Sequence, residues 1–160
     1  MKRKVYLETS VISYLAARPS KSIIGAAHQQ ITTAWWDKRS DYDLFVSELV
    51  LRECAPGDPD AAAKRLEIVK TIPLLVATEE AYQLAEALLK EGIIPVKAAE
   101  DGLHIAIAII HAVDYLLTWN CKHIANPELQ TKIMGYLKET EQFLPFVCTP
   151  EELLGEENND

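Results

Sequence analysis

Short apolar runs alternate with longer helical segments along nearly all of this 160-residue chain, and that alternation is the strongest constraint on its fold. Runs rich in β-branched and aromatic residues favour strands, and they lie at 3–7, 42–47, 72–78 and 115–120, with 146–149 as a candidate fifth. Parallel strands need helical crossovers of this kind. The sequence therefore predicts an α/β fold with a mainly parallel sheet of four to five strands and helices on both faces.

The intervening segments have the periodicity and the end signals of helices. The predicted helices span 20–40, 48–54, 59–70, 79–92, 97–113 and 127–141, and a last short helix begins at Thr149. In the helix predicted at 20–40, one face carries the apolar residues Ile24, Ala27, Ile31 and Trp35. The helix at 97–113 is apolar on nearly every side, so it is expected to lie in the core.

The length and composition fit one domain, predicted at 1–150 and followed by an acidic, frayed tail at 151–160. The net charge is −8, which disfavours contact with nucleic acid because phosphate contacts dominate that affinity. The last ten residues hold five acids and no base, so 19 acids face 16 bases in the rest, a net charge of −3. Much of the acidity therefore belongs to the tail.

The cysteines and the apolar segments indicate the cellular compartment in which the protein is expected. Cys54, Cys121 and Cys148 are far apart and have no metal-binding spacing, so reduced thiols and a cytoplasmic location are expected. The longest apolar region includes two histidines and Asp114, and it falls short of the roughly 18 uninterrupted apolar residues of a membrane span. No membrane association is expected.

Polar residues with oxygen-rich side chains follow the predicted strands. Glu8 ends the first strand and Asn120 follows the fourth, so both are expected at the carboxyl edge of the sheet, where such folds bind ligands. Glu53 lies on the helix after the second strand, and Asp101 lies near the start of the buried helix. Carboxylate and amide oxygens that converge suit Mg²⁺ or Mn²⁺, so the residues indicate an acidic metal site.

Each of these residues also has an ordinary structural interpretation. Glu8 fits a strand-end charge, Glu53 a solvated helix charge, Asp101 a helix-start acid and His104 a packed or supporting histidine, while Thr9 and Ser10 suit helix caps. The sequence has no nucleophile–base pair, glycine-rich phosphate loop or zinc spacing. Composition and periodicity alone therefore end at an α/β domain with an acidic metal site.

Three segments carry a resemblance to a known family: VYLETSVISYL (5–15), FVSELVLREC (45–54) and AEDGLHIAIAIIHAVDYLLTWNCKHIAN (99–126). Over residues 3–150 the chain resembles a PIN domain, and more closely the VapC-type toxin of VapBC toxin–antitoxin modules. The resemblance implies a three-layer α/β/α sandwich that cleaves single-stranded RNA with Mg²⁺ or Mn²⁺. It also implies a homodimer and a small antitoxin partner that occupies the active-site groove.

Carried over onto matching positions, the resemblance assigns catalysis to Glu8, Glu53, Asp101 and Asn120, of which the three acids would bind the metal. Thr9 or Thr118 would contact metal-bound water. The sequence departs from the usual pattern at three positions: the first acid is Glu8 rather than Asp, the fourth position is the neutral Asn120, and His123 replaces a further acid. Three formal negative charges suit one Mg²⁺ better than two.

Two other functions compete with this interpretation. The altered acids and the negative net charge suit a catalytically weak or inactive PIN-like module that binds RNA or a partner protein. A phosphorylated receiver-like switch is disfavoured because Glu8 is followed by Thr9 instead of a second acid, and because the strand at 72–78 contains no aspartate.

Overall fold

The computed structural model describes residues 1–155 and places its strands in one parallel sheet. The strands are β1 (Arg3–Leu7), β2 (Tyr42–Ser47), β3 (Leu74–Leu75), β4 (Tyr115–Leu117) and β5 (Phe146–Cys148). Their order across the sheet is β3-β2-β1-β4-β5, and every neighbouring pair is parallel. The predicted α/β class and parallel sheet are therefore confirmed.

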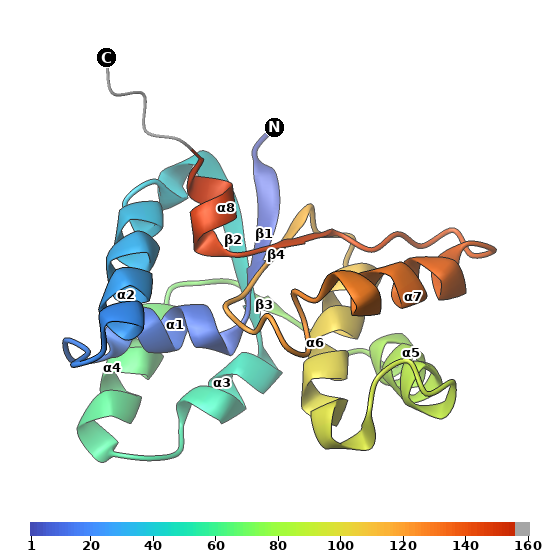
Figure 1. Ribbon diagram of the computed structural model, residues 1–160, viewed down its shortest axis with the longest axis horizontal. Coiled ribbons are helices and arrows are strands. Elements are labelled where there is room, and N and C mark those ends of the chain that lie inside the picture. Colours follow the sequence, from blue (N-terminus) through green and yellow to red (C-terminus); the bar gives the residue numbers. More distant parts are fainter. Residues whose placement is uncertain (156–160) are drawn as a thin grey trace.

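Helices cover both faces of the sheet. They are α1 (Thr9–Ala16), α2 (Ile23–Trp36), α3 (Glu48–Cys54), α4 (Pro59–Val69), α5 (Glu79–Lys90), α6 (Ala99–Ile110), α7 (Pro127–Leu137) and α8 (Pro150–Leu154), with short 3-10 turns η1 (Arg39–Asp41) and η2 (Val96–Ala98). Figure 1 shows α1 to α4 gathered on one side of the strands and α5 to α7 on the other. The fold is therefore a three-layer α/β/α sandwich.

The sequence signals at helix starts act as predicted. Ser47, Asp58 and Thr78 cap α3, α4 and α5 by accepting a backbone N–H. Thr149 and Glu152 form a reciprocal capping box at α8, which packs against α2. Helix α8 begins at Pro150 and ends at Leu154, so the described structure includes a helix after residue 150. The domain boundary at residue 150 remains a prediction. Within the predicted tail, residues 156–160 lie outside the described part.

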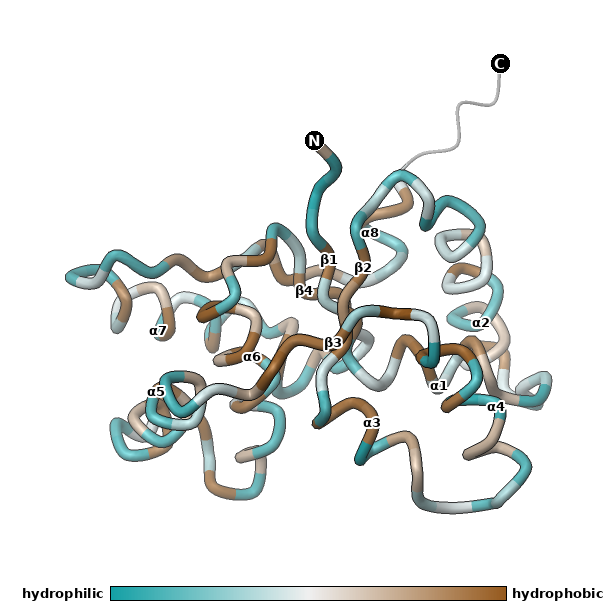
Figure 2. The backbone as a smooth tube through the Cα atoms, turned by 180° about the vertical axis from the view of Figure 1, so that it is seen from behind, coloured by the Kyte–Doolittle hydropathy of each residue, from teal (hydrophilic) through white to brown (hydrophobic). Residues whose placement is uncertain are grey.

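The core lies between the layers. Along β1 the first two residues are exposed and the last three are fully buried, and Figure 2 shows the matching change from hydrophilic to hydrophobic residues along the strand. Residues 102–109 of α6 are all buried, as the apolar pattern of this segment predicts. In residues 1–155, no helix combines the length and the apolar character that crossing a bilayer requires.

The helix predicted at 20–40 is present as α2, but its apolar face is exposed over the first half. Ile24 is 71% exposed and Ala27 is exposed, whereas Trp35 is fully buried. The first turns lie against the loop before α2, because the side chain of Gln29 bonds the backbone N–H of Ser20 and the carbonyl of Arg18. Ser22 caps the start of the helix by accepting the backbone N–H of Gly25, and the buried residues of α2, Thr32 and Trp35, lie in its second half.

Other elements are shorter than the sequence predicts. The strand expected at 72–78 pairs with β2 only at Leu74 and Leu75, where it forms the sheet edge next to Pro73, which has no backbone N–H. The helix expected at 127–141 ends at Leu137. The helix expected at 97–113 ends at Ile110, just before Ala112 adopts a left-handed φ of 52°.

Candidate metal centre

Two central strands end at the same level and deliver polar residues to one edge of the sheet. Leu7 of β1 is aligned with Leu117 of β4, and the backbone N–H of Glu8 donates to the Leu117 carbonyl at 3.0 Å. Glu8 and Thr118 therefore leave the sheet side by side. This is the carboxyl edge at which parallel sheets bind ligands.

The carboxylate of Glu8 is held from two elements. Its Oε2 accepts the backbone N–H of Ser10 at 3.2 Å, so Glu8 itself is the N-cap of α1. Its Oε1 accepts the hydroxyls of Ser10 at 2.5 Å and of Thr118 at 2.6 Å. Glu8 is only 6% exposed, yet its carboxylate is anchored by these donors. Thr9 and Ser10 are thus not the caps of this helix.

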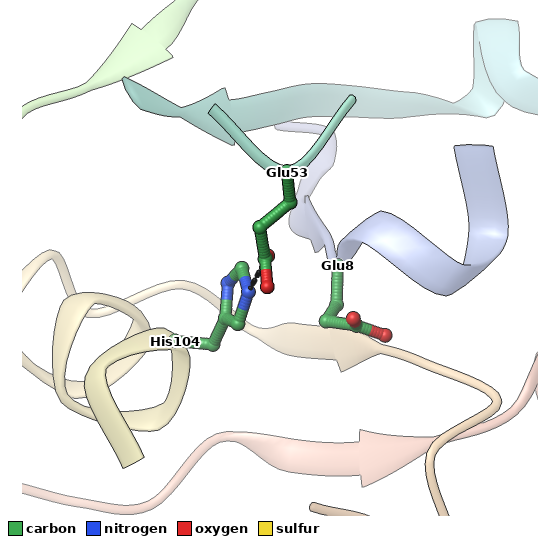
Figure 3. Close-up of side chains that lie close together, drawn as sticks. All are labelled: Glu8, Glu53 and His104. Atoms are coloured by element: carbon green, nitrogen blue, oxygen red, sulfur yellow. Dashed lines mark hydrogen bonds and ion pairs between the residues drawn. The ribbon is translucent and has the colours of Figure 1, made fainter. Parts of the chain in front are cut away.

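Glu53 reaches the same place from α3, as Figure 3 shows. Its Oε1 accepts the Thr9 hydroxyl at 2.7 Å and lies 2.5 Å from Nε2 of His104. Ligand atoms of Glu8, Glu53 and His104 all lie within 4.8 Å of one another. Burial raises the pKa of Glu53, but the bonds and charge of His104 and the Thr9 bond outweigh it and lower the pKa below its ordinary value. Glu53 is therefore favoured as a carboxylate.

A buried chain of hydrogen bonds fixes His104. The Tyr6 hydroxyl lies 2.7 Å from His104 Nδ1 and 2.7 Å from the Ser47 hydroxyl, whose oxygen also caps α3. Burial raises the pKa of Tyr6, so its hydroxyl keeps its proton and donates it to Nδ1. When Nδ1 of His104 accepts this bond, its Nε2 carries a proton and donates it to Glu53. This arrangement gives every one of these polar atoms a partner.

Asp101 lies near this cluster but is not one of the residues whose ligand atoms are within 4.8 Å of one another. It occupies the first turn of α6 and is half-buried. Burial raises the pKa of Asp101, and the negative charge of Glu8 raises it further, against the lowering effects of His104, Asn120 and His123. Glu8 and Asp101 are thus close enough to repel each other. Among residues 1–155, the group within 4.8 Å consists of Glu8, Glu53 and His104 instead.

Asn120 closes the loop after β4. Its Oδ1 accepts the backbone N–H of His123 at 2.9 Å, and its own backbone N–H donates to the Thr118 hydroxyl at 2.9 Å. Hydrogen bonding from Asn120 also lowers the pKa of Asp101, which places its amide beside that carboxylate. The Asn120 side chain therefore helps to order the loop after β4 and lowers the pKa of the neighbouring Asp101.

The donors of this centre fit a divalent cation. Among the described residues, no lysine or arginine forms an ion pair with Glu8, Glu53 or Asp101, and His104 is the basic side chain that contacts Glu53. Oε2 of Glu53 accepts no hydrogen bond from residues 1–155, and Oε2 of Glu8 accepts one. Free carboxylate oxygens suit Mg²⁺ or Mn²⁺. His104 uses Nε2 toward Glu53 and therefore supports a ligand.

Sequence reasoning missed two partners in this centre. Tyr6 was assigned only to a strand, although a tyrosine pointing inward from a central strand needs a buried partner for its hydroxyl. Ser47 caps α3 and also bonds Tyr6. A buried tyrosine and a histidine on an apolar helix are the signals that point to such a pair.

This protein is an α/β protein with a parallel sheet between two layers of helices, and carboxylates gather near the carboxyl ends of its strands. No protein-family model and no curated protein matches the sequence. The structure is similar to a chain in the crystal structure of VapBC2 from Rickettsia felis bound to a DNA fragment from their promoter. The TM-score is 0.50 and the identity 18%, over 74% of this chain and 89% of that chain. The expected resemblance to a VapC-type PIN domain is therefore confirmed at the level of the fold.

Proposed function

We propose that this protein is a metal-dependent endoribonuclease that cleaves single-stranded RNA, and that it is the toxin component of a toxin–antitoxin module. The observation that carries the proposal is that ligand atoms of Glu8, Glu53 and His104 lie within 4.8 Å of one another at the carboxyl edge, with Asp101 close enough for the charge of Glu8 to raise its pKa. The likeness in fold to a chain of the VapBC2 complex supports it.

In this proposal Glu8, Glu53 and Asp101 hold Mg²⁺ or Mn²⁺. When bound, the ion lowers the pKa of a coordinated water and offsets negative charge on the phosphodiester. The protein keeps the ligands in place: Ser10 and Thr118 hold Glu8, and Thr9 and His104 hold Glu53. Asn120 orients Asp101. Such fixed ligands reduce the reorganisation needed in the transition state.

The partners follow from the same proposal. A small antitoxin would cover the site, and the protein would act as a homodimer in the cytoplasm. A groove of about 460 Å³ between α3, α5 and α6 offers a place for a partner segment, and its walls include Arg52, which is next to Glu53 in the chain, and Glu100, which precedes Asp101. Tyr82 and Leu103 give this groove apolar contact surface.

Cleavage of a labelled single-stranded RNA with Mg²⁺ or Mn²⁺ tests the proposal. Asp101→Asn keeps the shape of the side chain and removes its charge, so cleavage should fall by about 100-fold or more, the size expected for the loss of one group that stabilises transition-state charge. Asp60→Asn makes the same chemical change in the first turn of α4 and should leave cleavage unchanged. Equal cleavage by wild type and Asp101→Asn would remove Asp101 from the mechanism.

A second candidate is a non-catalytic PIN-like module that binds RNA or a partner protein. The observation that favours it is the hydrogen bonding of the two altered positions: Glu8 accepts three bonds from the protein, and the oxygen of Asn120 accepts the His123 N–H. Calorimetric titration with millimolar Mn²⁺ separates the candidates. No heat together with intact RNA binding would favour this module.

A further inference from the structure

An aromatic cluster lies beside the candidate metal centre. The rings of Trp119 and His28 stack with centroids 3.9 Å apart and planes 16° apart, and Tyr14 meets both rings at a steep angle. All three side chains are only half-buried. The cluster therefore brings α1, α2 and the loop after β4 together at a surface that solvent reaches.

Hydrogen bonds fix this cluster in place. The indole Nε1–H of Trp119 donates to the Thr32 hydroxyl at 2.8 Å, and Thr32 in turn bonds the carbonyl of His28 one turn earlier in α2. The hydroxyl of Tyr14 lies 3.3 Å from Nδ1 of His28. The rings are thus held in one orientation, which lowers the entropy lost when a flat ligand stacks on them.

The same bonds tie the cluster to the acidic residues. The Ser10 hydroxyl oxygen accepts the backbone N–H of Trp119 at 2.8 Å while its proton goes to Glu8 at 2.5 Å. Trp119 also stands between Thr118, which bonds Glu8, and Asn120, which lies beside Asp101. The Trp119 backbone is therefore one hydrogen-bonded residue, Ser10, away from the carboxylate of Glu8.

We propose that Trp119 and His28, supported by Tyr14, form a nucleobase-stacking subsite for the RNA nucleotide next to the scissile phosphate. The inference rests on the proposed function for its substrate class and goes beyond it by naming the surface that binds a base. Every base has a π-face, so such a platform binds single strands with little sequence preference. The flanking Lys122 is exposed on the same loop and suits a backbone phosphate.

Packing alone would give the cluster a different signature. If the rings served only to join α2 to the loop after β4, their loss would lower stability without any dependence on the bases of the ligand. His28→Ala separates base stacking from packing because His28 is half-buried and its side chain reaches the cluster from α2. His28→Phe keeps a flat ring and is the matched conservative variant.

Fluorescence anisotropy with two probes tests the subsite in full-length protein with Mg²⁺. One probe is a short single-stranded oligouridylate and the other is a ribose-phosphate chain of equal length without bases. Wild type should bind the base-bearing probe about tenfold more tightly, as expected for one stacked base. His28→Ala should lose that preference, and His28→Phe should retain it. Thermal unfolding of each variant checks that all are folded.

The outcomes separate this inference from the proposed function. If RNA is bound with the predicted base dependence but is not cleaved, the proposed nuclease function is overturned and the base-stacking subsite is supported. RNA that is cleaved, with equal affinity for both probes or an unchanged preference in His28→Ala, would overturn the subsite and keep the nuclease. Absence of binding and of cleavage would overturn both.

Discussion

At the scale of single residues, the centre depends on side chains that hold other side chains. Glu53 can approach Glu8 because Thr9 and His104 both donate to it, and His104 is in turn fixed by Tyr6. These donors compensate the cost of burying a carboxylate without a lysine or arginine beside it. The chain of bonds from Ser47 to Glu53 is thus a structural requirement of the site.

Tyr6→Phe tests this chain of bonds. The substitution removes the hydroxyl shared by Ser47 and His104 and leaves both without their bond partner in a fully buried position. The free energy of unfolding, measured by urea denaturation, should fall by about 1–3 kcal/mol. Tyr136→Phe, at an exposed tyrosine, should change it by less than about 0.5 kcal/mol. Equal effects of the two variants would contradict a stabilising role for the chain of bonds from Ser47 to Glu53.

The buried thiol of Cys54 predicts a stability change in alkali. Burial raises the pKa of Cys54 to about 11 from an ordinary value of 9.0. Above pH 9 the unfolded chain therefore loses a proton that the folded protein keeps, so the free energy of unfolding falls between pH 9 and about 11. The slope from one thiol approaches about 1.4 kcal/mol per pH unit.

Cys54→Ala should flatten this slope in urea denaturation measured at successive pH values. Other groups titrate in the same range, so the comparison with wild type isolates the thiol. Cys121 is exposed, and Cys121→Ala should leave the slope unchanged. Parallel curves for wild type and Cys54→Ala would show that Cys54 keeps its ordinary pKa.

At the scale of elements, local sequence signals predicted where most strands and helices begin, because caps and β-branched runs act over a few residues. The errors arise where tertiary contacts decide. Residues 72–78 have strand composition, but only the two residues that face β2 can pair with it. The first turns of α2 look amphipathic, but Ile23 and Ile24 are exposed, and Gln29 bonds the loop before the helix.

The exposure of the first turns of α2 predicts unequal effects of two substitutions in this helix. Ile24→Lys replaces a side chain that is 71% exposed and should change the free energy of unfolding by less than about 0.5 kcal/mol. Trp35→Ala removes a fully buried ring and should cost about 3–5 kcal/mol. Chemical denaturation measures both. A large fall in the free energy of unfolding of Ile24→Lys would show that Ile24 is buried against the core.

At the scale of the whole molecule, the sheet topology brings together residues that are far apart in the chain. Glu8 and Asn120 could be placed at one edge from the sequence because each follows a strand, and parallel strands end together. The approach of Glu53 to His104 could not, since it depends on how α3 and α6 pack on the sheet. The roles of these residues as metal ligands remain predictions.

Location of Mn²⁺ by anomalous scattering, in crystals grown with and without the ion, tests the metal centre most directly. We predict one peak at the carboxyl edge of the sheet, about 2.1 Å from oxygens of Glu8 and Glu53, with Asp101 bound directly or through water. The peak should disappear in Glu53→Gln. A crystal in millimolar Mn²⁺ with no peak at these carboxylates, or an unchanged peak in Glu53→Gln, would contradict the assignment.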